Sequence, residues 1–305
     1  MSIEGSLGKG PEQVAPKSEF YQKLEGRWQQ GNFVCVGLDS DFKQFPELFK
    51  LAHNKGDAIF SFNRQIVDAT ADLVCAYKPN SAFYEALGRE GWDALSRTTN
   101  YIKNRYPEIP VILDAKRADI GNTNNGYVEA AFDVLRADAI TIHPYLGKEA
   151  MKPFLDRKDK GVIVLCRTSN PGAGEFQDFG DEYALGKMIG PSKDGHLYEK
   201  IARSVATEWN YNGNCALVVG ATYPEELRNV RWIAGDLPIL LPGIGAQGGD
   251  VEATVKAGRD SKNQGMIINS SRGIIFASKG NDFAQAARIE TQKLHDSINQ
   301  FRLAA

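Results

Sequence analysis

Residues 111–123 read V-I-L-D-A-K-R-A-D-I-G-N-T, and the interpretation of the whole chain starts from this stretch. Its first three residues are apolar and follow Pro110, so we expect a buried strand. Side chains two positions apart lie on the same face of a strand, so Asp114 and Lys116 should point the same way from its carboxyl end. An isolated pair of this kind is commonly a surface salt bridge, and only its context can assign it a function.

The second half of the stretch is a turn that leads into a helix. Asp119 lies beyond the strand, and the turn ends at Gly121. We expect Asn122 or Thr123 to cap the following helix, because short polar side chains accept hydrogen bonds from the first free amides of a helix.

Short apolar runs alternate with amphipathic segments along the chain. The predicted strands are 33–38, 73–77, 111–113, 139–142, 162–166, 216–219, 239–241 and 266–268. The predicted helices are 18–30, 57–71, 92–105, 124–135, 148–155, 196–210, 224–233, 249–256 and 283–302. Unbroken alternation implies a parallel sheet with helices outside it, and eight units imply closure into a (β/α)8 TIM barrel, an α/β fold. We expect residues 18–305 to form this barrel as a single catalytic domain and residues 1–17 to form a flexible tail.

An open, doubly wound sheet is the structural alternative to a barrel. That fold carries a glycine-rich fingerprint, G-x-G-x-x-G, directly after its first strand. Here the first strand ends G-L-D-S-D at residues 37–41, which lacks the fingerprint. The barrel is therefore the favoured fold.

Composition limits the possible partners. The chain of 305 residues has 36 Lys and Arg against 38 Asp and Glu, a net charge of -2, so we expect no nucleic acid and no anionic membrane as partner. Its apolar runs fall short of the roughly 18 residues of a membrane span, and it begins without a signal-peptide pattern. Four cysteines lie in separate apolar runs and read as core residues of a protein in a reducing cytoplasm: Cys35, Cys75, Cys166 and Cys215.

Charged and polar side chains gather at the carboxyl ends of the predicted strands, where TIM barrels have their active sites. They are Asp39, Lys78, Asp114, Lys116, His143, Ser169, Gln247 and Arg272. Charged groups brought together there lose hydration, which costs several kcal/mol unless they pair or meet a ligand. Their convergence therefore favours a ligand site, although we expect His143, which precedes Pro144, to be a structural histidine.

The last two strand ends have the composition of a phosphate site. Residues 242–250 read P-G-I-G-A-Q-G-G-D, and glycines let the backbone approach an anion closely. We expect the amides of Gly245, Gly248 and Gly249, the next helix N-terminus and Arg272 to hold a phosphate. The alternative is that these glycines only make tight turns.

Five motifs occur at the strand ends. They are Y-K-P-N at 77–80, D-A-K-R-A-D-I-G-N-T at 114–123, T-S-N-P-G at 168–172, P-G-I-G-A-Q-G-G-D at 242–250 and S-S-R-G at 270–273. With this combination the chain resembles orotidine 5'-phosphate decarboxylase, most closely the longer bacterial branch of that family, from about Val34 to Ala277. The D-x-K-x-x-D-I-x-N-T pattern is highly specific to the family, and the glycine loop is moderately so.

The resemblance implies the last step of pyrimidine nucleotide synthesis, in which orotidine 5'-phosphate loses its C6 carboxylate as CO2 and becomes UMP. It implies no metal and no organic cofactor. Lys78, Asp114, Lys116 and Asp119 match the family's alternating Lys-Asp-Lys-Asp array. Asp119 and Thr123 match residues that reach into the partner subunit's site, so the resemblance also implies a homodimer.

The chemistry explains why this array suits the reaction. Loss of CO2 from an sp2 carbon leaves a vinylic carbanion that no carbonyl delocalises, so electrostatics fixed in advance must lower the barrier. We expect Lys116 to stabilise charge at C6 and then to protonate that carbon. Asp114 is expected against the departing carboxylate, while Lys78 and Asp119 keep the array neutral and Lys116 charged.

The resemblance also assigns the other groups of the substrate. The expected contacts are Asp39 and Thr123 at the ribose hydroxyls, Ser169 at the pyrimidine ring, and Gln247 and Arg272 at the phosphate. Phosphate binding far from C6 can close loops and expel water, and the long loop after Arg167 is the expected lid. Within it, the insert 176–195 either extends the lid or covers a dimer edge.

Two alternatives to the decarboxylase remain. A metal-dependent 3-keto-sugar-phosphate aldolase or decarboxylase on the same barrel shares D-x-K-x-x-D, and it needs a divalent ion to stabilise an enediolate. Lys78 and Lys116 surround the carboxylates here with positive charge, which disfavours a metal. A phosphate-binding barrel without catalysis is the second alternative, and it would leave the charged array costly and unused.

Overall fold

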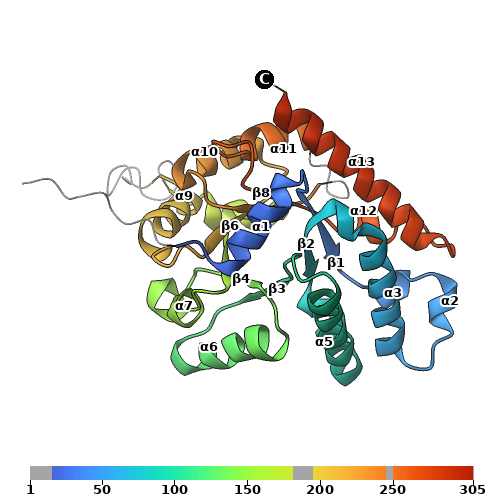
Figure 1. The fold of residues 1–305 in the computed structure, drawn as a ribbon. Helices are drawn as coiled ribbons and strands as arrows, with labels where there is room; N and C mark the ends of the chain where they lie inside the picture. Colours follow the sequence, from blue (N-terminus) through green and yellow to red (C-terminus); the bar gives the residue numbers. More distant parts are fainter. Residues whose placement is uncertain (1–15, 181–194, 245–249, 305) are drawn as a thin grey trace, which may run out of the picture.

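The computed structural model describes residues 16–180, 195–244 and 250–304. In these residues eight parallel strands form a nearly closed barrel, so the predicted TIM barrel is confirmed (Figure 1). The strands are β1 Val34–Leu38, β2 Val74–Pro79, β3 Ile112–Arg117, β4 Ala139–Ile142, β5 Gly161–Arg167, β6 Cys215–Val219, β7 Ile239–Pro242 and β8 Met266–Ser270. Each predicted strand overlaps one of them.

The described helices surround the barrel, most of them on its outside and the first of them at its amino-terminal end, where it contacts β2 and β5. They are α1 Glu19–Gln29, α2 Glu47–Lys50, α3 Lys55–Thr70, α4 Ser81–Glu85, α5 Gly88–Arg105, α6 Gly121–Val128, α7 Gly147–Leu155, α8 Gly174–Gln177, α9 Leu197–Ser204, α10 Pro224–Ala234, α11 Val251–Gly258, α12 Arg272–Ile275 and α13 Phe283–Leu303. π-Helical turns over Glu129–Val134 and Val205–Trp209 extend α6 and α9. The last helix, α13, packs along α3 and α11 on the outside of the barrel (Figure 1).

The apolar periodicity of the sequence becomes the core. In α1, Phe20, Leu24 and Trp28 lie on one buried face, and Ser18 caps the helix by accepting a hydrogen bond from the Tyr21 amide at 3.2 Å. The strands of the barrel are largely buried on both faces, because side chains fill the interior and helices cover the exterior; the carboxyl end of β3, where Lys116 lies, is the exception. The four cysteines are buried and free, in agreement with their predicted role as core residues.

The barrel closes between β2 and β3. The sheet order is β2-β1-β8-β7-β6-β5-β4-β3, so these two strands form its ends. Isolated bridges pair Tyr77 with Val111 and Asn80 with Asp114, and the Tyr77 amide donates to the Pro110 carbonyl at 3.1 Å. Among the described residues the seam between β2 and β3 therefore has bridges in place of a continuous ladder.

Strand β3 bulges where it carries the charged residues. Leu113 pairs with Ile140 of β4 and Arg117 pairs with Ile142, so β3 advances by four residues where β4 advances by two. Lys116 lies in this bulge with a φ of 48°, in the left-handed region that favours glycine. The predicted strand is thus correct, but it is regular only up to Leu113.

The prediction that Asn122 or Thr123 caps α6 is wrong. The helix already begins at Gly121, with Ile120 at its N-cap position and without a side-chain cap. The buried Asn124 side chain binds the preceding loop instead: its Oδ1 accepts from the Asp119 amide at 2.8 Å, and its Nδ2 donates to the Asp119 carbonyl at 2.6 Å. These two hydrogen bonds to the Asp119 backbone anchor the loop to the first turn of α6.

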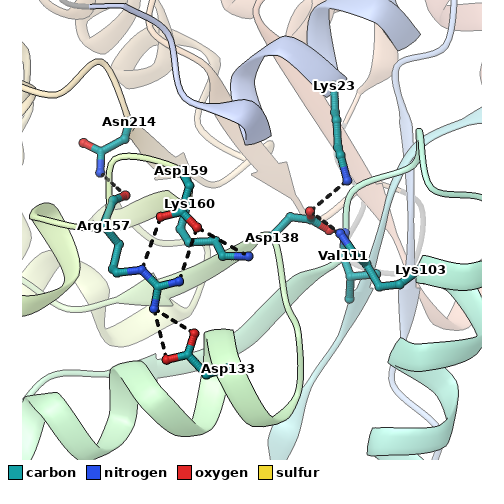
Figure 2. Close-up of polar contacts among 9 residues, drawn as sticks. All are labelled: Lys23, Lys103, Val111, Asp133, Asp138, Arg157, Asp159, Lys160 and Asn214. Atoms are coloured by element: carbon teal, nitrogen blue, oxygen red, sulfur yellow. Dashed lines mark hydrogen bonds and ion pairs between the residues drawn. The ribbon is translucent and has the colours of Figure 1, made fainter.

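The amino-terminal end of the barrel has its own polar cluster, which Figure 2 shows. The Asp138 carboxylate accepts from Lys23 Nζ at 3.0 Å, from Lys103 Nζ at 2.5 Å and from the Val111 amide at 2.9 Å. Burial lowers the pKa of the Lys103 ammonium, although its attraction to Asp138 opposes the shift. The cluster joins α1, α5 and the starts of β3 and β4 at the end that is structural in TIM barrels.

Three predicted segments lie wholly or largely outside the described residues. They are the tail 1–17, the insert 176–195 and the glycine loop 242–250. The proposed division into a tail and one catalytic domain therefore stays a prediction. No helix in the described part of the chain is long and apolar enough to cross a lipid bilayer.

Candidate functional site

Three predicted site residues form one ion-paired group at the carboxyl ends of β2 and β3. Lys78 Nζ lies 2.8 Å from Asp114 Oδ2, and Lys116 Nζ lies 2.6 Å from Asp114 Oδ1. The side chains of Lys78 and Asp114 are only 4% and 9% exposed, whereas that of Lys116 is 50% exposed. One carboxylate is thus held between a buried ammonium and an ammonium that is open to the barrel's mouth.

Electrostatics keeps the buried pair charged. Burial alone would lower the pKa of the Lys78 ammonium, but attraction to Asp114 and Asp39 outweighs burial and raises that pKa. Burial alone would raise the pKa of the Asp114 carboxyl, but Lys78 and Lys116 outweigh it and hold that pKa well below its usual range. Both groups are therefore ionised at neutral pH.

Thr141 of β4 contacts this group from the opposite side, a role that the sequence analysis did not assign. Its Oγ1 lies 2.9 Å from Asp114 Oδ1 and accepts from the amides of Ala115 at 3.1 Å and Lys116 at 3.0 Å. A left-handed backbone costs a non-glycine residue about 1–2 kcal/mol. The hydrogen bonds from the Ala115 and Lys116 amides, worth about 0.5–1.5 kcal/mol each, are of the same size as that cost and oppose it. The sequence held one sign of this role, because Thr141 is a polar residue within the otherwise apolar strand A-I-T-I at residues 139–142.

Asp39 and Asn269 each present a buried oxygen at neighbouring strands. Asp39 follows β1, and Asn269 lies in β8, which pairs with β1. The Oδ1 atoms of both side chains are buried and have no hydrogen-bond partner within the described ranges. An unpaired buried acceptor costs about 1–3 kcal/mol, so two of them at the barrel's mouth point to donor groups on a ligand. Asp39 was predicted as a site residue and Asn269 was not.

Asp119 and Thr123 do not join the ion-paired group of their own chain within the described residues. The Asp119 carboxylate accepts from the Ile120 amide at 2.7 Å, and in the part of the chain that the structure describes it forms no hydrogen bond or ion pair with Lys78, Asp114 or Lys116. The Thr123 side chain is exposed in the first turn of α6. The structure therefore brings three members of the predicted four-residue array together within one chain.

The remaining predicted residues occupy the mouth or fall outside the described chain. Ser169 is half-buried after β5, directly beside Gly220, where an added Cβ would lie 2.7 Å from the Ser169 Cβ. Arg272 is exposed at the first residue of α12, and its guanidinium has no hydrogen-bond or ion-pair partner among residues 16–180, 195–244 and 250–304. Gln247, Gly245, Gly248 and Gly249 lie outside these ranges.

His143 is held by backbone atoms, as expected of a structural histidine. Its Nε2 lies 3.1 Å from the Ala118 carbonyl, and its amide donates to the Arg117 carbonyl at 3.0 Å. These contacts tie the end of β4 to the loop that follows β3. His143 therefore supports the loop on which Asp119 lies.

The charged groups are arranged as ion pairs. Both oxygens of Asp114 are occupied by ammonium groups. In the described residues, no group of three or more His, Cys, Asp or Glu side chains is placed to hold a metal ion. The arrangement can orient an ammonium toward an anionic centre and supply a proton to it.

A family model and two curated relatives of similar sequence are described as orotidine 5'-phosphate decarboxylases. The sequence model of the Orotidine 5'-phosphate decarboxylase / HUMPS family matches residues 32–288. A curated orotidine 5'-phosphate decarboxylase of Azoarcus sp. (strain BH72) is 50% identical over 288 residues, covering 93% of this chain and 99% of the relative. One from Cellvibrio japonicus (strain Ueda107) is 48% identical over 285 residues, with the same two coverages.

Solved structures resemble the chain over most of its length. The OMP decarboxylase of Leishmania donovani has a TM-score of 0.78 and 37% identity, covering 94% of this chain and 99% of that chain. The UMP synthase of Leishmania donovani has a TM-score of 0.80 and 38% identity, covering 95% of this chain and 57% of that one. This chain thus spans little more than half of the UMP synthase.

Proposed function

The chain belongs to the Orotidine 5'-phosphate decarboxylase / HUMPS family, and we infer that it converts orotidine 5'-phosphate to UMP with release of CO2. One observation carries this inference at the site: the Lys78–Asp114–Lys116 group at the carboxyl ends of neighbouring strands. It supplies a preorganised positive charge beside a fixed negative charge, which is what the loss of a carboxylate from C6 requires.

We propose that Lys116 is the proton donor. When the bond between C6 and the carboxylate breaks, the electron pair stays on C6, and the Lys116 ammonium supplies the proton that becomes the C6 hydrogen of UMP. Its exposure of 50% leaves it able to meet a ligand, while its 2.6 Å contact with Asp114 fixes its direction. Such a donor contributes typically 10²–10⁴-fold to a rate, besides the electrostatic stabilisation of the carbanion.

We propose that Asp114 and Lys78 act as fixed charges around that ammonium. Asp114 has a strongly lowered pKa, so it stays ionised and does not compete for the proton that Lys116 must deliver. Lys78 is buried and neutralises Asp114 from the side opposite Lys116. The charges then need no rearrangement during the reaction, which is the source of preorganised electrostatic catalysis.

The contacts to the rest of the substrate remain our proposals. Asp39 is expected to accept from the ribose hydroxyls, which agrees with its buried oxygen that has no partner in the described chain. Arg272 is expected to bind the phosphate together with Gln247, Gly245, Gly248 and Gly249. Its guanidinium is exposed and has no partner within the described ranges, which agrees with this role. Ser169 and Thr123 are proposed at the pyrimidine ring and the ribose.

We propose a homodimer in which Asp119 and Thr123 complete the partner's site. Asp119 has no described contact with the ion-paired group of its own chain, as a residue acting across an interface requires. Ile120 is 61% exposed beside it, and Tyr145 in the loop before α7 is 85% exposed. Helices α6 and α7 pack against each other, so both apolar side chains belong to adjoining parts of the surface.

We further propose that the reaction needs no metal or organic cofactor and takes place in the cytoplasm. Both Asp114 oxygens face ammonium groups, which leaves this carboxylate a poor ligand for a divalent cation. Four free, buried cysteines fit a reducing compartment. A metal-dependent 3-keto-sugar-phosphate enzyme is the competing activity, because such enzymes share the D-x-K-x-x-D pattern of residues 114–119.

One assay separates the candidates. Purified protein is mixed with orotidine 5'-phosphate, with and without EDTA, while ultraviolet absorbance follows the conversion to UMP. We expect full activity in both samples. No conversion would contradict the proposed function, and activity lost in EDTA and regained with Mg²⁺ would contradict the proposal that no metal takes part. A parallel assay with a 3-keto-sugar phosphate tests the competing activity directly.

A further inference from the structure

The Thr141 hydroxyl uses all of its hydrogen-bonding capacity at the site. A hydroxyl has one proton to donate and two lone pairs to accept with. The amides of Ala115 and Lys116 occupy both lone pairs, at 3.1 and 3.0 Å. The proton must therefore point to the remaining neighbour, Asp114 Oδ1, at 2.9 Å. Thr141 is 1% exposed, so water does not replace these bonds.

The bulge in β3 explains why a side chain is needed at this place. Between Leu113 and Arg117, β3 advances by four residues while β4 advances by two. The backbone of β4 therefore cannot supply an acceptor to every amide of the bulge. Thr141 is the residue of β4 that faces the bulge, and its Oγ1 takes the place of the missing carbonyl acceptors.

We propose that Thr141 is a positioning residue for the decarboxylation, fixing the Asp114 carboxylate and the left-handed Lys116 backbone relative to each other. The Thr141 hydroxyl binds the Lys116 amide directly. It also donates to Asp114 Oδ1, the oxygen that Lys116 Nζ contacts, so it influences both the backbone and the ammonium of Lys116. Thr141 itself acts only through these two residues. This inference rests on the proposed function, because it concerns the geometry of that reaction.

The test replaces the hydroxyl while keeping the shape of the side chain. Thr141→Val removes the three hydrogen bonds, and Thr141→Ser keeps the hydroxyl while losing the methyl group. We expect kcat of the Val variant to fall by about 10–100-fold, because a misplacement of about 1 Å can cost that much. We expect its KM to change less than threefold, and the Ser variant to retain kcat within about threefold.

Thr291→Val is the matched control. Thr291 is fully buried in α13, and its hydroxyl donates to the Ala287 carbonyl at 2.7 Å, far from the site in the sequence and on the outer layer of the barrel. This variant loses a buried hydroxyl of the same kind, so it reports the general cost of that loss. We expect its kcat to equal that of the unaltered protein.

Hydrogen exchange gives a readout that is independent of activity. Exchange measured by mass spectrometry on a peptide covering residues 112–119 should speed up in Thr141→Val and stay unchanged in Thr141→Ser, because only Val leaves two amides without acceptors. Should the Val variant fail to fold, Thr141→Cys provides the test, since a thiol is a weak donor and acceptor, and its kcat should fall at least threefold.

The outcomes separate this inference from the proposed function. An unaltered protein that does not decarboxylate orotidine 5'-phosphate would overturn the proposed function. An active protein whose Thr141→Val variant keeps kcat within threefold would overturn the inference alone. A Ser variant as slow as the Val variant, or a Thr291→Val control that slows equally, would also overturn it, because the hydroxyl would then have no particular role.

Discussion

Lys78 Nζ and Asp114 Oδ2 lie 2.8 Å apart across the seam between β2 and β3. These strands end the sheet order, and in the described chain isolated bridges join them in place of a ladder. The ion pair is nearly buried, so water weakens it less than it weakens a surface pair. The charges proposed for catalysis thus also link the strands where the backbone pairing is sparse.

Replacing Lys116 by alanine should nearly abolish turnover. Lys116→Ala removes the proposed proton donor and the positive charge next to C6, so we expect kcat to fall at least about a thousandfold. Steady-state decarboxylation assays measure the change. Lys293→Ala is the control, because Lys293 is 67% exposed and pairs with Glu290 of the same helix, α13, and it should keep full activity. A Lys116→Ala protein that retains more than about a thousandth of the turnover would rule out the assignment.

The phosphate contact can be tested with a truncated substrate. Arg272→Ala should lower kcat/KM for orotidine 5'-phosphate by several orders of magnitude, since phosphate binding energy is expected to drive closure of the site. The same variant should act on orotidine, which has no phosphate, as well as the unaltered protein does. Arg105→Ala, at the exposed end of α5, is the control. A loss below tenfold would contradict the phosphate role of Arg272.

Mixing two inactive variants tests whether Asp119 acts across a dimer interface. Lys116→Ala and Asp119→Ala subunits are refolded together, so that half of the dimers contain one of each. If Asp119 serves the partner, each mixed dimer has one intact site, and a twofold dimer should regain about a quarter of the full activity. Lys116→Ala mixed with Asp114→Ala is the control and should stay inactive, because both changes affect one subunit's own group. No recovery in the first mixture would contradict the shared site.

The lowered pKa of Asp114 predicts how stability responds to acid. An ordinary aspartate has a pKa of about 3.9. Since the folded protein lowers the pKa of Asp114, this carboxylate stabilises the fold above about pH 4, and that contribution is lost as the pH falls through the folded pKa. The free energy of unfolding relative to Asp114→Asn should be level from pH 6 to 5 and fall by up to about 1.4 kcal/mol per pH unit below pH 4. Urea unfolding at several pH values measures it. A difference that stays level down to pH 3.5 would contradict the shift.

The sequence predicts the barrel well because its apolar runs are local and regular. The strand ends also identify Lys78, Asp114 and Lys116, since parallel strands bring their carboxyl ends to one edge. The contacts of Thr141 and Asn124 were not predicted. Those of Thr141 depend on the bulge in β3, and those of Asn124 depend on where α6 begins, and local sequence patterns reveal neither. The mistaken prediction of a cap at Asn122 or Thr123 has the same cause, since the helix begins at Gly121, before both of these residues.

The ends of the segment between α8 and α9 meet. The Leu197 amide donates to the Phe179 carbonyl at 2.8 Å, and a Cβ added at Gly180 would collide with the Gly195 carbonyl oxygen. Chain inserted between two points that already touch adds little closure entropy as it lengthens, about 0.6 kcal/mol for each doubling. A shortened or foreign segment grafted between Gly180 and Gly195 would therefore leave β5 and α9 in their present positions. This site is thus suited to the insertion of foreign sequences.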